Sequence, residues 1–384
     1  MLEWLILGGG VHGTHISLAL RARGVPEHHL RVLDPHPRPL AAWDRRARSI
    51  GMPFLRSPDM HHIDLAAPSL HLFAHRHAGH RDLIRRYHRP SLALFSEHVE
   101  HVVTRNRLDQ LRLRGQATRI DQKGDTFRVD SDQGQLHARR LVIAVGAAGG
   151  PRIPSWAAPL LLTPSPRIAH VFSDTYDPHD DARAADLVVL GGGLSAIQLA
   201  IARARDGARV TMLSPHPLRV SDFDPDPCWS TDRCLRRLAR LHDPTARRRL
   251  IEQERRPGTV PPEVARQLSQ AVQRGQLCWR EDPISAAHQR PEGLDLHLQS
   301  GAIVRPDRLL LATGLRCHLP FFLAHLAEAM QLPIAPCGAP WLTPELAWAP
   351  RIYVSGALAE LQLGPAAGNI IGTRLAARRI ASSS

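Results

Sequence analysis

The feature that most constrains the fold is a glycine-rich turn close to the start of the chain. Residues 3–20, EWLILGGGVHGTHISLAL, place three spaced glycines between a short apolar run and a segment with helical spacing. Gly8 permits a tight turn, Gly10 lets the main chain approach a pyrophosphate, and Gly13 allows the helix to pack on the strand. The helix N-terminus would then offer free N–H groups to phosphates. The segment therefore predicts a strand–turn–helix unit that binds a dinucleotide.

A second apolar run at residues 30–33 ends in Asp34. A carboxylate at the end of the second strand accepts a hydrogen bond from a free ribose 2′-hydroxyl and repels a 2′-phosphate. We therefore expect the first site to hold the adenosine half of FAD.

The same pattern returns in the middle of the chain. An apolar strand at 186–190 leads into Gly191, Gly193 and Ser195, with Ala196 where the third glycine would stand. The following strand ends in Ser214 rather than in an acid, and Arg219 comes five residues later. A serine with a nearby arginine can hold a 2′-phosphate, so we expect NADPH at this second site. The alternative is that Ser214 only caps the strand end and that NADH is used.

Composition narrows the class of protein. The formal net charge is +13, but the basic residues are almost all arginine and do not alternate with aromatic residues. We expect a basic cleft for an anionic cofactor rather than a nucleic-acid surface. No apolar run approaches the roughly 18 residues of a membrane span, and the chain opens directly in its first strand. The expected partner is a small molecule, and the oligomeric state is left open.

Cysteine and histidine patterns give no metal or redox motif. The five cysteines contain no C-x-x-C, which favours reduced thiols and a cytoplasmic location. His71 and His75 have helical i,i+4 spacing, but no cysteine or acid nearby in the sequence completes a ligand set. We therefore expect no metal site.

Periodicity predicts the remaining elements. Residues 80–102 have helical spacing, 111–144 are predicted to form short strands, and 233–276 are predicted helical with a break at 257–262. A buried strand ends at Gly146, and a similar run of residues ends at Gly314. The last strand leads to Gly356, Gly364, Ala366 and Ala367 and then to a final helix that ends near residue 380.

Two glycine fingerprints, two strand-to-glycine exits (IAVG and LATG) and a C-terminal strand–Gly–helix resemble the two-dinucleotide-binding-domain flavoproteins. Within them the chain looks most like the flavin-dependent monooxygenases, above all the branch that N-hydroxylates lysine and ornithine, with FLRSP at 54–58 as a loose match. The resemblance implies an α/β fold of two Rossmann-like domains. The FAD-binding domain would be residues 1–155 and 302–384, interrupted by an NAD(P)H-binding domain at 156–301. It also implies a flavoprotein monooxygenase that uses NADPH on a small molecule.

The resemblance brings further candidate site residues. Gly146, Gly356, Gly364, Ala366 and Ala367 would adjoin the flavin, and the start of the final helix would stabilise negative charge on it. Trp43, with Met52, Phe54 and Leu55, would wall a dry pocket or belong to the ordinary core. Arg56 and Ser57 are the candidates for holding peroxide, NADP or substrate, with a structural salt bridge as the alternative for Arg56.

Three departures from the family pattern keep alternatives open. No redox cysteine pair stands where disulfide reductases need one, and the usual Gly-Asp near the C-terminus is Gly356-Ala357. The amino-acid-binding residues of the N-hydroxylating branch are not recognisable. The alternatives are an NAD(P)H oxidoreductase that reduces a quinone, a protein or another acceptor, and a flavin-binding protein with little turnover.

Overall fold

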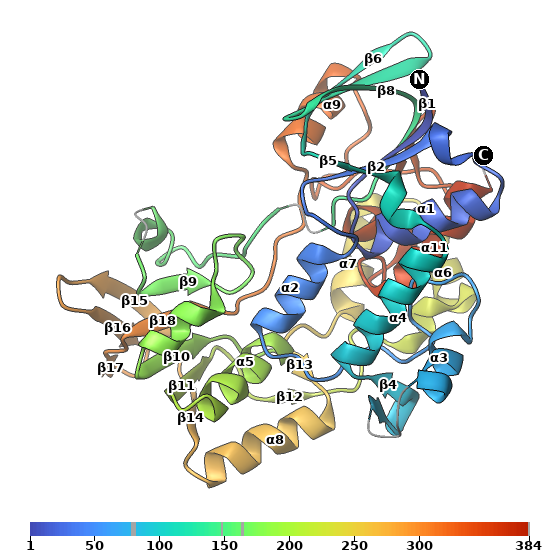
Figure 1. The fold of residues 1–384 in the computed structure, drawn as a ribbon. Helices are drawn as coiled ribbons and strands as arrows, with labels where there is room; N and C mark the ends of the chain where they lie inside the picture. The colour runs from blue at the N-terminus through green and yellow to red at the C-terminus, as the bar shows by residue number, and fades with distance from the viewer. Residues whose placement is uncertain (78–81, 147–148, 163–164, 383–384) are drawn as a thin grey trace.

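The structure, a computed structural model, describes residues 1–77, 82–146, 149–162 and 165–382 (Figure 1). Two separate sheets organise it. The first has the order β19 (Ala347–Ala349), β20 (Ile352–Val354), β8 (Gly134–Ile143), β1 (Leu2–Leu7), β2 (Leu30–Asp34) and β5 (Arg112–Arg114), and the hairpin β6 (Ala117–Lys123) and β7 (Thr126–Ser131) extends it from β8. The second has the order β14 (Leu277–Glu281), β11 (Arg209–Ser214), β10 (Asp186–Leu190), β18 (Arg308–Leu311) and β9 (Ile168–His170). The strands of the second sheet are all parallel.

The two sheets repeat one arrangement. In the first, Ile6 of β1 lies between Val32 of β2 and Val142 of β8, all parallel. In the second, Val189 of β10 lies between Met212 of β11 and Leu310 of β18. Buried parallel strands need apolar side chains on both faces, which explains the uninterrupted apolar runs. The expected α/β fold with two Rossmann-like units is confirmed.

Helices complete each unit. α1 (Val11–Ala22) packs against α11 (Ile370–Ala381) beside the first sheet, and α5 (Leu194–Arg205) packs against α8 (Pro262–Gln273) beside the second. The further helices are α2 (Ala41–Ser49), α3 (Ser69–His77), α4 (Leu92–Arg105), α6 (Asp232–Ala239), α7 (Pro244–Glu254), α9 (Phe321–Ala329) and α10 (Glu360–Leu363). Short strands make up smaller sheets: β3 (Leu83–Ile84) with β4 (Arg89–Pro90), β12 (Arg219–Val220) with β13 (Thr259–Val260), and β15 (Ile284–Gln289) with β16 (Leu294–Leu298) and β17 (Ile303–Val304). None of the helices within the described ranges is long and apolar enough to cross a membrane.

The helix predicted at 80–102 was partly wrong. The helix α4 begins at Leu92, and the described residues before it form β3, the 3-10 turn η3 (Arg86–His88) and β4. Pro90 lacks an N–H, and Ser91 is the N-cap, since its Oγ accepts a hydrogen bond from the Leu94 N–H at 3.1 Å. The predicted strands within 111–144, the helices within 233–276 and their break are confirmed.

Two segments lie across the domain limits expected from the sequence. Strand β18 belongs to the second sheet, although it falls within 302–384. Helices α6 and α7 fall within 156–301, but Leu235, Leu238 and Ile251 pack into the core around β1, because their apolar faces point toward it. The chain leaves the first sheet after β8 and returns to it at β19, so the second unit is an insertion. The residue limits of the FAD-binding and NAD(P)H-binding domains therefore remain a proposal.

Cys228 and Cys234 form a disulfide, with their Cα atoms 5.7 Å apart. The expectation of reduced thiols was wrong for this pair, because the 3-10 turn η7 (Pro227–Ser230) and the first turn of α6 fold the chain back on itself. Cys278, Cys317 and Cys337 are free and exposed.

Candidate active site

The first glycine turn has the geometry that its spacing predicts. Gly8 has φ +106°, and a Cβ there would lie 2.4 Å from the Ala144 carbonyl oxygen, while a Cβ at Gly13 would lie 1.8 Å from the Gly8 carbonyl oxygen. Both positions therefore need glycine for protein packing. A Cβ at Gly10 would meet no described atom within 4 Å. Gly10 is the N-cap of α1 and gives it no side-chain cap, so open space lies beside free N–H groups, which fits a pyrophosphate.

Asp34 stands at the end of β2 and faces this turn. Its Oδ2 accepts a hydrogen bond from the Gly9 N–H at 2.5 Å, and its Oδ1 accepts one from the His36 N–H at 2.8 Å. Each carboxylate oxygen has a second lone pair, which leaves acceptor capacity for a ribose hydroxyl. Arg112, from β5, donates to the His36 carbonyl and approaches Asp34 Oδ1 at 3.9 Å. Sequence reasoning missed Arg112, because only the parallel pairing of β2 with β5 brings it here.

The C-terminal loop at Ser355 and Gly356 contacts α1 through His12. Gly356 has φ +81°, and a Cβ there would touch the His12 ring at 3.8 Å. The Nδ1 of His12 bonds to Ser355 Oγ at 2.8 Å, while its buried Nε2 has no hydrogen-bond partner among the residues described. Burial, with His15 nearby, lowers the pKa of His12 to about 4, so its ring is neutral at pH 7. A neutral imidazole thus stands beside the loop where Ala357 replaces the aspartate of the resembling family.

The N-terminus of the last helix, α11, is a second helix N-terminus in this region. The helix α11 begins at Ile370, later than expected, and the buried Ala366 and Ala367 lie in the preceding turn. Its N-cap Asn369 gives no side-chain cap, so the first N–H groups stay open to a ligand. Gly364 has φ +72°, and a Cβ there would lie 2.5 Å from the Trp229 ring. Gly364 is therefore required by packing. Gly146, with φ +71°, follows the end of β8.

The second glycine turn matches the first. Gly191 has φ +148°, and a Cβ there would lie 2.7 Å from the Ala312 carbonyl oxygen at the end of β18. Gly8 has the same relationship to the Ala144 carbonyl oxygen at the end of β8. Gly193 is the N-cap of α5 without a side-chain cap, and Ser195 lies half-buried in the first turn. The first N–H groups of α5 therefore have no side-chain cap. The main chain of Gly258 would lie 3.4 Å from a Cβ at Gly193, so the space here is narrower than at Gly10.

Ser214 and Arg219 are separated by a turn. The Ser214 hydroxyl donates to the His216 carbonyl at 2.6 Å, which is the local cap of the alternative interpretation. Arg219 is exposed at the start of β12, with one N–H directed to the Pro257 carbonyl at 3.4 Å. The positive charge beside this turn is therefore carried by Arg219, and Ser214 is used mainly by the backbone.

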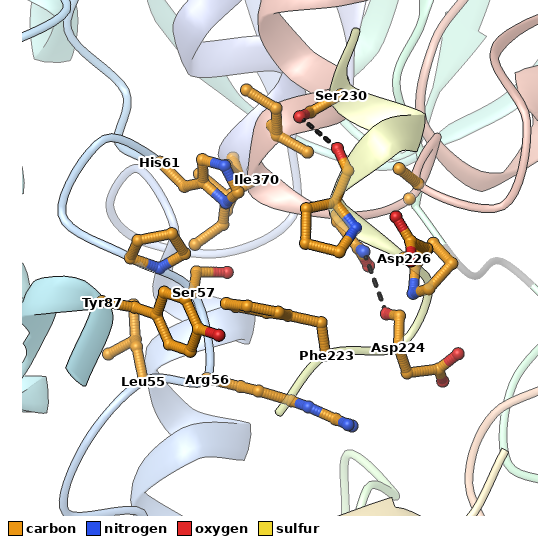
Figure 2. Close-up of a pocket in the computed structure, with 18 of the residues that line it drawn as sticks. Leu55, Arg56, Ser57, His61, Tyr87, Phe223, Asp224, Asp226, Ser230 and Ile370 are labelled. Atoms are coloured by element: carbon orange, nitrogen blue, oxygen red, sulfur yellow. Dashed lines mark hydrogen bonds between the residues drawn. The ribbon is translucent and has the colours of Figure 1, made fainter. Parts of the chain in front are cut away.

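A cavity of about 410 Å³ lies between α1, α2, the start of α11 and the loop that precedes η7 (Figure 2). Val11 at the N-terminus of α1 and Asn369 and Ile370 at the N-terminus of α11 belong to its lining. Trp43, Met52 and Leu55 line it as expected, whereas Phe54 is not among the lining residues. Trp43 also packs on Phe95, with ring centroids 5.0 Å apart, so it serves both the cavity and the core.

Ser57 and Arg56 lie on the same wall but differ in their bonding. Ser57 lines the cavity. The Arg56 guanidinium donates to the carbonyls of Ser221, Asp222 and Thr259 at 2.8, 2.9 and 3.1 Å, and to Thr259 Oγ1 at 2.9 Å. It holds two segments of the inserted unit against the first, and burial lowers its pKa. The Arg56 side chain is committed to backbone acceptors rather than to a salt bridge.

Several lining residues had no sequence signal. Tyr87 and Phe223 meet at 4.7 Å between ring centroids, and Figure 2 shows them side by side next to Arg56. Burial, with Arg374 nearby, lowers the pKa of His61 to about 4, so it is neutral at pH 7. The ionised side chains in the lining are then Arg56, Asp224 and Asp226. They come from distant segments, which explains why periodicity could not bring them together.

Solved structures share this fold. Ornithine hydroxylase from Pseudomonas aeruginosa superposes with a TM-score of 0.80 at 18% identity, over 100% of this chain and 98% of that one. L-lysine 6-monooxygenase from Pseudomonas syringae gives 0.75 at 19% identity, over 100% and 99%. Bacillithiol disulfide reductase from Bacillus cereus gives 0.61 at 18% identity, over 100% and 98%. The expected similarity in fold to flavin monooxygenases is confirmed.

No match was found among curated proteins. The family model described as pyridine nucleotide-disulphide oxidoreductase matches residues 5–243, which include both glycine turns, the intervening strands and the disulfide. This match covers more than half of the chain and confirms an oxidoreductase with FAD and a nicotinamide dinucleotide as the cofactors that the two turns fit. The chain belongs to the pyridine nucleotide-disulphide oxidoreductase family.

Proposed function

We propose that the protein is an NADPH-dependent flavoprotein monooxygenase of a small molecule. The observation that carries the proposal is the cavity itself, because it lies beside two helix N-termini without side-chain caps and is lined by an aromatic pair. When bound, FAD would accept hydride from NADPH and activate oxygen. Such chemistry needs a site from which bulk water is excluded, and Trp43, Met52 and Leu55 give this cavity an apolar wall.

We assign the following roles in cofactor and substrate binding to individual residues. Gly8, Gly10 and Gly13 would hold the FAD pyrophosphate, and Asp34 would bind its adenosine ribose. The first N–H groups of α11 would stabilise negative charge on the reduced ring. Gly191, Gly193 and Ser195 would bind the NADPH pyrophosphate, and Arg219 the 2′-phosphate. Arg56 would position the inserted unit, and Ser57 would donate a hydrogen bond to the substrate or to a peroxide.

Charge in the cavity supports a cationic substrate. Asp224 and Asp226 each use an oxygen for a main-chain N–H, that of Arg256 at 2.7 Å and that of Cys228 at 2.8 Å. Their two negative charges outweigh the single positive charge of Arg56, whose N–H groups already have acceptors. The two monooxygenases of similar fold are titled for ornithine and lysine, which both carry a side-chain amine. We therefore propose a small amine as the substrate. The cytoplasmic location also stays a proposal, which the three free thiols support and the disulfide does not.

Product analysis distinguishes the proposal from its rivals. The holoprotein would be reduced with NADPH under nitrogen and then mixed with oxygen and ornithine, lysine or a simple diamine. A monooxygenase consumes NADPH in step with a hydroxylated product detected by mass spectrometry. Rapid quinone reduction without any hydroxylated product would instead establish the acceptor oxidoreductase. A flavin that NADPH does not bleach would establish the binding protein with little turnover.

The substrate class has its own test. Asp224→Asn and Asp226→Asn keep the side-chain shape and remove one negative charge each. Both should raise KM for an amine at least threefold while FAD content stays unchanged. The exposed Asp109, in the 3-10 turn after α4, supplies the control Asp109→Asn. An unchanged KM in both cavity variants would reject the amine, but not the monooxygenase.

A further inference from the structure

Three side chains with metal-ligating atoms meet beside the cavity. Asp59 lies in the loop after α2, His71 on α3, and His88 at the end of the turn η3. One donor atom from each lies within 4.8 Å of the other two. The sequence pairs His71 with His75 by helical spacing and places no acid near them in the chain. The fold supplies Asp59, because the main-chain N–H of Asp59 donates to the His88 carbonyl at 3.1 Å and so joins their two segments.

We propose that Asp59, His71 and His88 form a binding site for a divalent transition-metal ion such as Zn²⁺. The Nδ1 of His71 lies 2.7 Å from Asp59 Oδ2, and the Nδ1 of His88 lies 3.9 Å from the same oxygen. Two imidazoles and one carboxylate are a donor set that zinc accepts, whereas Mg²⁺ and Ca²⁺ prefer oxygen ligands alone. Water would fill the remaining coordination positions.

The burial of the three donors suits such a site. Asp59 is 4% exposed, whereas the side chains of His71 and His88 are 35% and 57% exposed. The carboxylate is therefore at the base and the imidazoles are at the rim, so an ion can enter from solvent. The rings of His71 and His88 stack with centroids 5.6 Å apart, so the two imidazoles lie next to each other.

A further histidine supports the orientation of His71. His71 and His75 lie one turn apart on α3, and their Nε2 atoms are 3.0 Å apart. When one histidine nitrogen binds a metal, the other commonly donates to a polar partner that fixes the ring. His75 can accept that hydrogen bond from His71, and so it would be a positioning residue rather than a ligand.

The backbone of the turn is set to present His88. Tyr87 and His88 have φ values of +64° and +47°, in the left-handed region that residues other than glycine rarely adopt. This conformation turns the Tyr87 ring into the cavity and His88 toward Asp59. Pro58 and His61, which lie close to Asp59 in the sequence, and Tyr87, which precedes His88, line the cavity. A bound ion would therefore hold the cavity wall that carries Tyr87.

Metal binding can be measured directly on the FAD-loaded protein, prepared without a histidine tag and dialysed against a chelator and then metal-free buffer. Titration with Zn²⁺ should give one ion per chain with a dissociation constant in the micromolar range or below. X-ray absorption at the zinc edge should show nitrogen and oxygen neighbours only, which excludes the three free cysteines as ligands. Zn²⁺ should also raise the midpoint of thermal unfolding.

Single substitutions assign the site. Asp59→Asn, His71→Ala and His88→Ala should each weaken Zn²⁺ binding at least tenfold, and His75→Ala by less than that. The matched control is His28→Ala, in the surface turn Glu27–His29 before β2, and it should bind as the unchanged protein does. FAD content and circular dichroism verify that each variant is folded. The proposal is overturned if no stoichiometric binding is found, or if the three ligand variants bind Zn²⁺ as tightly as the His28 control.

Discussion

The carboxylate of Asp34 and the main-chain N–H of Gly9 are joined by a hydrogen bond of 2.5 Å, which ties the end of the second strand to the middle of the glycine turn. This bond positions the acid beside the open N-terminus of α1. It also means that Asp34 has two roles, since it shapes the turn and keeps acceptor capacity for a ribose hydroxyl.

Replacing Asp34 should therefore release FAD. A hydrogen bond to a charged group contributes about 1.5–3 kcal/mol, so Asp34→Ala should weaken FAD binding by at least about tenfold. Flavin absorbance per chain after gel filtration, followed by titration of the apoprotein with FAD, measures the loss. Asp109→Ala removes an exposed acid elsewhere and serves as the control. Full flavin content in the Asp34 variant would contradict this assignment.

The glycines of the first turn should separate packing from cofactor binding. Gly13→Ala would place a Cβ 1.8 Å from the Gly8 carbonyl oxygen and should lower the free energy of unfolding by about 1–3 kcal/mol. Gly10→Ala meets no described atom within 4 Å, so it should cost the apoprotein under about 1 kcal/mol and yet abolish FAD binding. Urea unfolding of the apoproteins and FAD titration give the two quantities. If Gly10→Ala retains FAD, the pyrophosphate does not lie there.

Arg219 should decide between the nicotinamide nucleotides. Loss of a charge-assisted contact to the 2′-phosphate should raise KM for NADPH about tenfold to a hundredfold in Arg219→Ala, and KM for NADH less than about threefold. Steady-state reduction of the bound flavin with each nucleotide measures the ratio. Arg240→Ala, an exposed cation at the end of α6, is the control. Equal losses for both nucleotides would show that Arg219 does not contact the 2′-phosphate, as the NADH alternative requires.

Thiol titration should detect the disulfide. The chain has five cysteines, of which Cys228 and Cys234 are bonded, so denatured protein purified without reductant should react at three thiols and, after reduction, at five. Reduction should also loosen the cavity wall, because Pro227 and Ser230 line it within the same turn. Five reactive thiols before reduction would restore the original expectation of reduced cysteines.

Buried histidines should make the protein acid-sensitive. Burial above all, with His62 nearby, lowers the pKa of His98 from 6.5 to about 3, so it is neutral in the folded state. Below pH 6.5 the unfolded chain binds a proton that the folded chain does not. The free energy of unfolding should therefore fall as the pH drops from 6.5 toward 3, by at most about 1.4 kcal/mol per pH unit for this group.

Urea unfolding between pH 7 and 5 measures how steeply the free energy of unfolding changes with pH. His98→Gln should reduce this slope by the equivalent of up to one proton taken up on unfolding. The exposed His28 gives the control His28→Gln, which should leave the slope unchanged. A slope that stays the same in the His98 variant would show that other groups cause the acid sensitivity.

The sequence alone determined both dinucleotide units. Gly13 is fixed by a contact within its own strand–turn–helix, which is local and follows from spacing, whereas Gly8 and Gly191 are also held by strand ends far along the chain, at Ala144 and Ala312. The apolar runs at 4–7 and 187–190 are short and lead into glycine turns, which favours buried parallel strands and thereby the fold class. Local signals failed at 82–91, where helical spacing was present but Pro90 and Ser91 started the helix later, while residues 80 and 81 of the predicted helix lie outside the described part of the chain.

Only the tertiary structure decided which distant side chains share a site. Tyr87 and Phe223, or Asp59 and His88, come from segments far apart in the chain that meet only in the folded protein, and no periodicity encodes such contacts. The same holds for Arg56, which the family resemblance offered as a catalytic candidate and whose N–H groups bond to carbonyls far along the chain. The spacing of glycines and apolar residues in the sequence determines short-range geometry, whereas the pairing of remote segments depends on how the two cores pack together.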